Sequence, residues 1–221
     1  GYSAKQTLNL MQSLYETHKV LTYPRTDSRY LTKDIVPTLK ERLDAVSIGP
    51  YKTLAQQAKR RPLKEKPGFV NDAKVSDHHA IIPTMELAKA DLAALPESER
   101  NILTLAGARL LFAAAEPHIY EAVTAVFSCA GSEFTAKGKT VLCMGWKELE
   151  RRYRATLKKK PDTDDEENAL ALDAPPFAEG QSFDRPAVKV TAHDTTPPKQ
   201  HTDVIFCERK EWIGIEERSS A

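Results

Sequence analysis

The hydrophobic pattern of this chain changes at Pro117, and this change restricts the fold to the α+β class. Before it, the apolar residues of Glu97–Ala114 recur at helical spacing, and a proline stands just outside each end of that segment. After it, residues Ile119–Cys129 and 133–144 have the alternating pattern of strands and are separated by a short turn that contains glycine. We therefore expect helices in the first part of the chain and a β-hairpin in the second.

Three further helices are expected before this point. Ser3 is a good N-cap for a first helix that carries Tyr15 on its apolar face and residues 18–19 in its last turn. Apolar residues at helical spacing predict a second helix within residues 32–46 and a short third one at 51–60. A basic loop broken by prolines follows the third helix.

The end of the chain is expected to be less regular. Residues 145–148 should end the hairpin, and residues 155–182 should form a linker or long loop. Residues 186–193 have the composition of a third strand. Beyond residue 203 the apolar residues have no helical spacing.

Charge is balanced overall but not locally. The chain has 32 basic and 31 acidic residues, so its net charge of +1 predicts no polyanionic partner. Residues 52–74 and 147–160 each hold seven basic and two acidic residues, a local net charge of +5. Such blocks either contact phosphates or form a solvated surface, and the sequence leaves both open.

The three cysteines and the apolar segments exclude several classes of protein. No Cys-x-x-Cys spacing occurs, so neither a disulfide framework nor a zinc site is expected, and the cysteines are interpreted as packing residues in a reducing cytoplasm. No apolar run has the length of a membrane span. The chain begins with Gly1 and enters almost directly into a helix, which we interpret as a piece of a longer protein.

Residues 21–31 contain the first group of candidate reactive side chains. Tyr23 is followed at the second position by Arg25, with a rigid proline between them and a polar cluster after them. A tyrosine attacks phosphorus only after losing its proton, and its ordinary pKa is about 10. A neighbouring guanidinium favours the phenolate and can bind two phosphate oxygens. The structural alternative is a turn with a buried tyrosine and a surface arginine.

Residues 77–84 contain the second group. His78 and His79 are adjacent, so a regular helix or strand cannot direct both toward one metal ion. The apolar residues that follow are typical of a buried segment that would anchor the pair. Without other information, one imidazole would lie at the surface and the other would pack.

These two segments, 55 residues apart from Tyr23 to His78, resemble the active-site motifs of type IA DNA topoisomerases. The string Tyr-Pro-Arg-Thr-Asp-Ser-Arg-Tyr-Leu is most similar to the bacterial topoisomerase III branch. The resemblance implies that Tyr23 attacks a DNA phosphodiester and holds the 5′ phosphate as phosphotyrosine while a second strand passes. It implies that Arg25 stabilises the phenolate and the scissile phosphate. His78 would bind the scissile strand or change the charge of the site near neutral pH.

The resemblance and the local charges also give a set of residues that would contact DNA. The partner implied is single-stranded DNA, held by basic side chains and by stacking on aromatic rings. The expected DNA-binding residues are Arg25, Asp27, Ser28, Arg29, Lys59, Arg60, Arg61, His79 and Lys199.

The family also implies an architecture and a cofactor. A helical, winged-helix-like tyrosine domain is expected over residues 1–117, part of a β-rich arch over 118–202, and a tail unlike the family over 203–221. Mg²⁺ would be bound by an amino-terminal domain that this chain lacks. Residues 162–167 copy the spacing of that domain's acidic cluster, but no buried strand precedes them, so we expect a solvated loop and no metal ligand.

Two other interpretations belong to different classes of function. The chain could be a catalytically inactive remnant that binds single-stranded DNA, because the metal domain is missing. It could also be a helical protein–protein module, although this leaves Tyr23, Arg25 and His78 unexplained. The resemblance favours a type IA topoisomerase fragment, an isomerase of the cytoplasm and nucleoid that is inactive by itself and needs no ATP.

Overall fold

The first helix, α1 (Ala4–Glu16), begins where the sequence predicts. The computed structural model describes residues 1–47, 52, 55–56, 68–157, 178–184, 191–192 and 194–195. The Ser3 hydroxyl accepts a hydrogen bond from the Gln6 amide, and the Gln6 side chain accepts one from the Ser3 amide. The helix ends at Glu16, so the prediction that residues 18–19 form its last turn is wrong. Lys19 adopts a left-handed φ of 57°, which ends the helical path.

The second predicted helix forms in two parts. A 3₁₀ segment, η1 (Lys33–Thr38), contains Pro37 and leads into α2 (Leu39–Val46). Leu39 and Leu43 of α2 are buried in the core. Two short 3₁₀ segments follow, η3 (Asp72–Lys74) and η4 (Met85–Lys89), and η4 packs against α2.

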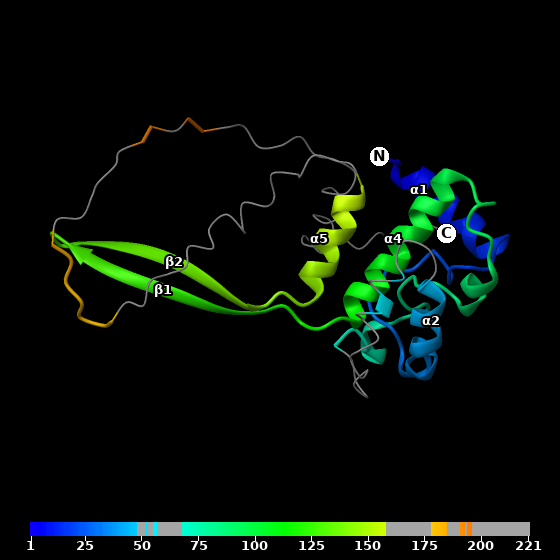
Figure 1. Cartoon of the computed structure of the whole chain (residues 1–221), viewed down its shortest axis with the longest axis horizontal. Helices are drawn as coiled ribbons and strands as arrows, with labels where there is room; N and C mark the ends of the chain where they lie inside the picture. The colour runs from blue at the N-terminus through cyan, green and yellow to red at the C-terminus, as the bar shows by residue number, and fades with distance from the viewer. Residues whose placement is uncertain are drawn as a thin grey trace, which may run out of the picture. The chain divides into compact units, whose positions relative to one another are not determined.

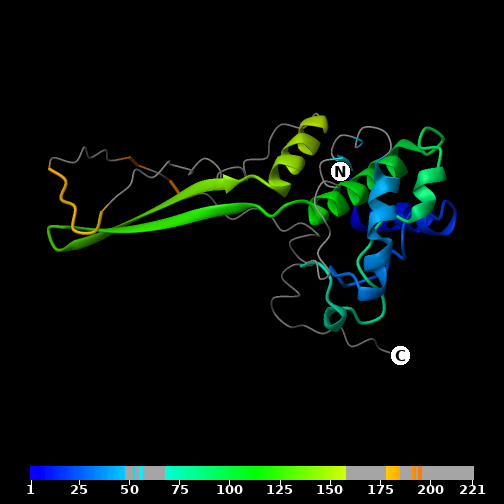
Figure 2. The same cartoon turned by 60° about the horizontal axis from the view of Figure 1, so that its bottom comes forward.

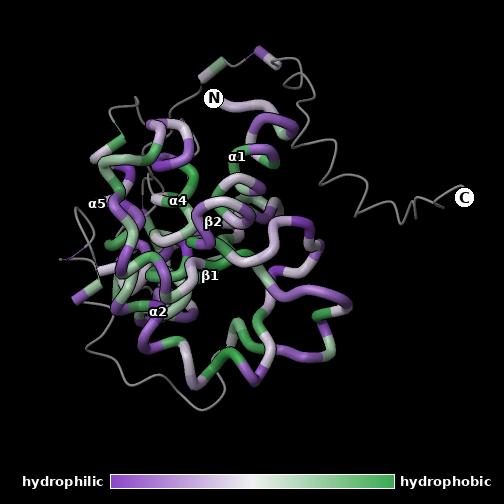
Figure 3. Tube along the Cα trace, turned by 90° about the vertical axis from the view of Figure 1, so that its right-hand side faces the viewer, coloured by the Kyte–Doolittle hydropathy of each residue, from purple (hydrophilic) through white to green (hydrophobic). Residues whose placement is uncertain are grey.

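The long helix α4 (Glu97–Ala114) has the bounds predicted from its flanking prolines. It packs against α1, α2 and α5, as Figure 1 shows for the labelled helices. Each of these helices carries both hydrophobic and hydrophilic residues, as expected when one face is turned to a core (Figure 3). At Gly107 a β-carbon would lie 3.0 Å from a Val46 methyl group, so glycine allows the close approach of α2 and α4.

The hairpin predicted after Pro117 is present. Strand β1 (Ile119–Cys129) pairs antiparallel with β2 (Ser132–Cys143), and Ala125 lies opposite Ala136. It forms a long two-stranded ribbon whose side chains are mostly exposed (Figures 1 and 2). The mixture of helices with an antiparallel sheet confirms the α+β class. Cys129 is exposed, so its interpretation as a packing residue is wrong.

Residues 145–148 do not simply end the hairpin, because they begin helix α5 (Trp146–Thr156). Gly145 has a φ of 50°, and a β-carbon there would lie 2.3 Å from the Pro117 carbonyl oxygen. Only glycine fits this turn, and the Trp146 amide then donates to the Glu116 carbonyl at 2.8 Å. Phe112 of α4 packs edge-to-face on Tyr153 of α5, with 6.0 Å between the ring centroids.

The chain divides into two units, Gly1–Phe177 and Ala178–Ala221. In the second unit, the Gln181 amide donates to the Ala178 carbonyl across a turn at 3.1 Å. Most of the expected helix at 51–60, of the loop at 155–182 and of the strand at 186–193 lies outside the described residues, and the described residues 52, 55 and 56 are helical. None of the described helices has the length and apolar character needed to cross a membrane.

Arg42 is a buried cation that connects α2 to the segment following His78. Its Nη1 donates to the Pro83 carbonyl at 2.8 Å, and its Nε donates to the Thr38 hydroxyl at 2.9 Å. Burial lowers the pKa of the Arg42 guanidinium from its ordinary value. These bonds fix the position of the segment that carries His78 relative to the helical core.

We predict that Arg42→Met lowers the free energy of unfolding by about 2 kcal/mol, because the buried Pro83 carbonyl loses its donor. Urea denaturation would measure the loss. Lys40→Met removes an exposed cation from the same helix and should change stability by less than about 0.5 kcal/mol. Equal stability of the two variants would contradict this role for Arg42.

Candidate active site

Two segments far apart in the sequence, residues 19–31 and 69–84, lie side by side and are called here the paired segments. Leu21 forms an antiparallel bridge with Pro83, and Leu31 forms a parallel bridge with Val70. The Thr22 amide donates to the carbonyl of residue 82 at 3.0 Å. Leu21, Leu31 and Pro83 are buried, so apolar packing secures the pairing at both ends.

The pairing brings Tyr23 and His78 together. Their ring centroids lie 4.4 Å apart, with an angle of 48° between the ring planes. Tyr15 of α1 packs edge-on against Tyr23 at a centroid distance of 5.4 Å. Tyr23 is half-buried and His78 is exposed. The Tyr23 ring is therefore held by two aromatic neighbours, and the adjoining imidazole is accessible from solvent.

Thr26 fixes the two motifs to each other. Its hydroxyl donates to the His78 carbonyl at 2.6 Å and accepts from the Ser28 amide at 3.0 Å. Thr26 is half-buried. Its hydroxyl has one partner as a donor and another as an acceptor. Sequence reasoning did not single out Thr26, and its place in the polar cluster directly after Arg25 is the only sequence signal of its role.

Arg25 is exposed and is oriented by α1. Its Nη2 donates to the Gln12 side-chain oxygen at 3.3 Å, and the Gln12 amide nitrogen donates to Glu16 at 2.8 Å. Because a carboxylate only accepts, Glu16 turns the Gln12 oxygen toward Arg25. The hydrogen bonds found among the described residues include none between Arg25 and the Tyr23 hydroxyl. The bond from Arg25 to Gln12 uses one of the five N–H groups of the guanidinium.

Several of the expected DNA-binding residues have partners within the protein. The Ser28 hydroxyl donates to the Lys74 carbonyl at 2.8 Å, and Asp27 accepts from the Ser76 hydroxyl at 3.4 Å. The Nδ1 of His79 lies 2.7 Å from the Ala80 carbonyl oxygen, to which it can only donate. The contacts of Ser28 and Asp27 join the paired segments, whereas that of His79 stays within its own segment.

Of the other expected DNA-binding residues, Arg29 is the one that the structure describes. It is exposed on the same segment as Tyr23. Lys59, Arg60, Arg61 and Lys199 lie outside the described residues.

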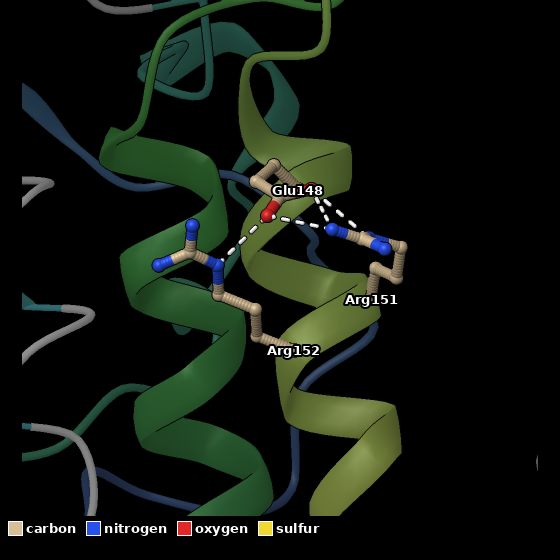
Figure 4. Close-up of polar contacts among 3 residues, drawn as sticks. All are labelled: Glu148, Arg151 and Arg152. Atoms are coloured by element: carbon tan, nitrogen blue, oxygen red, sulfur yellow. Dashed lines mark hydrogen bonds and ion pairs between the residues drawn. The ribbon is translucent and has the colours of Figure 1, made fainter.

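The part of the second basic block that is described lies on α5 and is largely neutralised within the helix. Glu148 contacts Arg151 at 2.9 Å and Arg152 at 2.8 Å, as Figure 4 shows. Glu150 contacts Arg154 at 3.2 Å. Hydrogen bonds from Arg151 and then Arg152 lower the pKa of Glu148 to about 2. This part of the block therefore resembles a solvated surface more than a phosphate site.

Comparison with known proteins identifies the family. A family model described as DNA topoisomerase matches residues 1–209. DNA topoisomerase 3 of Bacillus licheniformis is 43% identical over 203 residues, which are 92% of this chain and 26% of that protein. DNA topoisomerase 3 of Bacillus subtilis is 41% identical over 203 residues, 92% of this chain and 27% of its own length. That of a Bacillus cereus strain is 50% identical over 154 residues, 69% of this chain and 21% of its own length.

The chain therefore belongs to the DNA topoisomerase family. Within it, the chain falls in the topoisomerase III branch of the type IA enzymes, and the resemblance found at residues 21–31 and 77–84 is confirmed. It spans about a quarter of the length of these relatives. Within the described part of the chain, no group of three or more His, Cys, Asp or Glu side chains could hold a metal ion.

We predict that Thr26→Val lowers the free energy of unfolding by about 1 kcal/mol, because the His78 carbonyl and the Ser28 amide both lose a partner. Hydrogen exchange at the Ser28 amide should become faster in this variant. Thr26→Ser keeps the hydroxyl and is the matched control. Unchanged exchange in Thr26→Val would show that the bond across the paired segments is absent in solution.

We predict a carboxyl titration of Glu148 near pH 2, measured by carbon-13 NMR. The pKa in the folded chain is depressed below the ordinary value of 4.5, so the stabilisation of α5 by these contacts is complete above about pH 4.5. It is lost as the pH falls toward 2. Replacing Arg151 and Arg152 together by Gln should return the midpoint toward the ordinary value. A midpoint near 4.5 in the unchanged chain would contradict the geometry.

Proposed function

We propose that this chain carries the reaction centre of a topoisomerase that cleaves and rejoins one DNA strand through Tyr23. The Tyr23 oxygen would form a bond to phosphorus while the bond from phosphorus to the 3′ oxygen breaks. The Tyr23 hydroxyl gives up its proton, the 3′ oxygen leaves and takes up a proton, and the reverse reaction restores the phosphodiester. The phosphotyrosine conserves the energy of the broken bond, so no ATP is needed. The observation that carries this proposal is the 4.4 Å contact between the Tyr23 and His78 rings.

Arg25 is proposed to bind the scissile phosphate and to favour the Tyr23 phenolate. Its guanidinium is exposed and uses one N–H on Gln12, so its other donors can reach a phosphate. The bond to Gln12 fixes the guanidinium near α1, the same helix whose Tyr15 packs on Tyr23. A positive charge in this position would offset the negative charge that develops on the phosphate oxygens during attack.

His78 is proposed to donate a hydrogen bond to the backbone of the scissile strand. Its imidazole lies against the Tyr23 ring and is exposed, and Thr26 holds its carbonyl in place. A donor in this position would bind the strand beside the attacked phosphate. Asp27 and Ser28 would act mainly by keeping the paired segments in register, because their polar atoms already have partners on the other segment. His79 would act mainly by holding its own segment in shape.

The architecture of the longer protein is also proposed. Residues 1–117 would form the helical, winged-helix-like tyrosine domain, and the β1–β2 hairpin would begin a β-rich arch extending over residues 118–202. Single-stranded DNA would be the substrate, in the cytoplasm and associated with the nucleoid. Mg²⁺ would be held by an amino-terminal domain of the longer protein. The described residues offer no set of ligands for it.

An inactive protein that binds single-stranded DNA is the second candidate. The observation that favours it is the absence of a metal-binding cluster from the described residues. By this account the chain would bind DNA but never become joined to it. Both candidates predict that residues 1–221 alone do not relax supercoiled plasmid, so the two are separated by supplying the metal domain.

We predict that Tyr23 becomes covalently joined to DNA when the chain is combined with the amino-terminal metal domain of a related topoisomerase 3. Tyr23→Phe should remove the adduct while the protein still folds, because one half-exposed hydroxyl contributes about 1 kcal/mol at most. Arg25→Ala should form the adduct more slowly. Mass spectrometry of the nuclease-digested product would locate the nucleotide.

Tyr120→Phe is the matched control for Tyr23→Phe, because Tyr120 is an exposed tyrosine on β1. It should form the adduct as the unchanged chain does. An adduct that survives Tyr23→Phe would disprove the assignment. If no adduct forms in the unchanged chain while DNA still binds, the second candidate is correct.

A further inference from the structure

We propose that Lys74 and Tyr30 form a binding site for a backbone phosphate of the DNA strand that is cleaved at Tyr23. The identity of the ligand rests on the proposed function. The contacts between Lys74 and Tyr30 that form the site take no part in the proposed reaction. Lys74 is exposed, and Tyr30 is half-buried. The phosphate bound here would belong to a nucleotide close to the scissile one.

The two side chains form a pair of hydrogen-bond donors. The Lys74 ammonium donates to the Tyr30 hydroxyl oxygen at 3.1 Å and lies 4.7 Å from the centre of its ring. Because the Tyr30 oxygen accepts this bond, its own proton is free to donate elsewhere. The ammonium retains two further N–H groups. No acceptor for these protons occurs among the contacts of the described residues.

The charge on Lys74 is also not balanced by a carboxylate within the described residues. The closest acidic residue in sequence, Asp72, is engaged by Lys33, whose ammonium lies 2.9 Å from it and whose backbone amide donates to it at 2.8 Å. Asp27, on the other paired segment, accepts from Ser76. Two adjacent donors with one net positive charge match the oxygens of a phosphodiester.

The pair lies on the same paired segments as Tyr23 and His78. The Ser28 hydroxyl donates to the Lys74 carbonyl, and the Ala80 amide donates to the Tyr30 carbonyl, both at 2.8 Å. Lys74 precedes His78 by four residues, so their Cα atoms are at most about 14 Å apart. A short oligonucleotide can therefore contact the reaction centre and this pair at the same time.

The test is the affinity of residues 1–221 for a short fluorescent oligothymidylate, measured over a series of salt concentrations. Lys74→Met should weaken binding several-fold and reduce the salt slope by about 0.7, the value for one phosphate contact on a single strand. Tyr30→Phe should weaken binding by about five-fold with no change in slope, because a neutral donor releases no counterion. Lys74→Arg should keep the slope.

Lys33→Met is the matched control, because it removes an equal charge that is already paired with Asp72. It should leave the salt slope unchanged. The proposal is overturned if Lys74→Met and Tyr30→Phe bind as the unchanged chain does, if Lys33→Met loses as much as Lys74→Met, or if the unchanged chain does not bind at low salt. Tyr30→Phe is nearly isosteric and decides the question if Lys74→Met fails to fold.

Failure of the proposed function gives a different result. In that case no covalent adduct forms at Tyr23 with the metal domain present, while binding remains sensitive to Lys74 and Tyr30. If the adduct forms and neither variant changes affinity or slope, the reaction centre is correct and the phosphate site is wrong.

Discussion

The hydrogen bond from Thr26 to the His78 carbonyl is the contact on which the candidate site depends. It joins residues that are 52 positions apart, and it holds the backbone of His78, whose ring contacts that of Tyr23. Buried apolar residues bring the paired segments together at Leu21 and Leu31, and backbone hydrogen bonds such as that from the Thr22 amide to the carbonyl of residue 82 set the register there. The Thr26 hydroxyl, with one donor and one acceptor bond, adds a side-chain link to this pairing at His78.

Helix α1 supports the same site through two of its side chains. Leu14 is fully buried and anchors the helix, while Tyr15 and Gln12 on neighbouring positions contact Tyr23 and Arg25. The helix thus both packs in the core and contacts the candidate site, and its sequence pattern does not show which residues do which. Leu14 contributes to the core, and the neighbouring Tyr15 and Gln12 contact Tyr23 and Arg25, the residues to which the reaction is proposed to belong.

Local patterns predicted the regular elements because their cause is local. The bounds of α4 follow from its flanking prolines, and the hairpin follows from alternation around a turn with Ala130 and Gly131 in left-handed conformations. Helix α5 was missed although Glu148 and Arg152 stand at helical spacing, because the turn at Gly145 depends on the Pro117 carbonyl nearby. The roles of Thr26 and Lys74 require the pairing of distant segments, which no local pattern shows.

The most direct test of this account is an NMR titration of residues 1–221 with a short single-stranded oligonucleotide, observing the tyrosine and histidine ring signals. The account predicts that Tyr23, Tyr30 and His78 shift together at one DNA concentration, while Tyr120 on the hairpin and Tyr153 on α5 stay unchanged. Shifts confined to Tyr120 or Tyr153, with Tyr23 and His78 unchanged, would contradict the claim that the paired segments bind DNA.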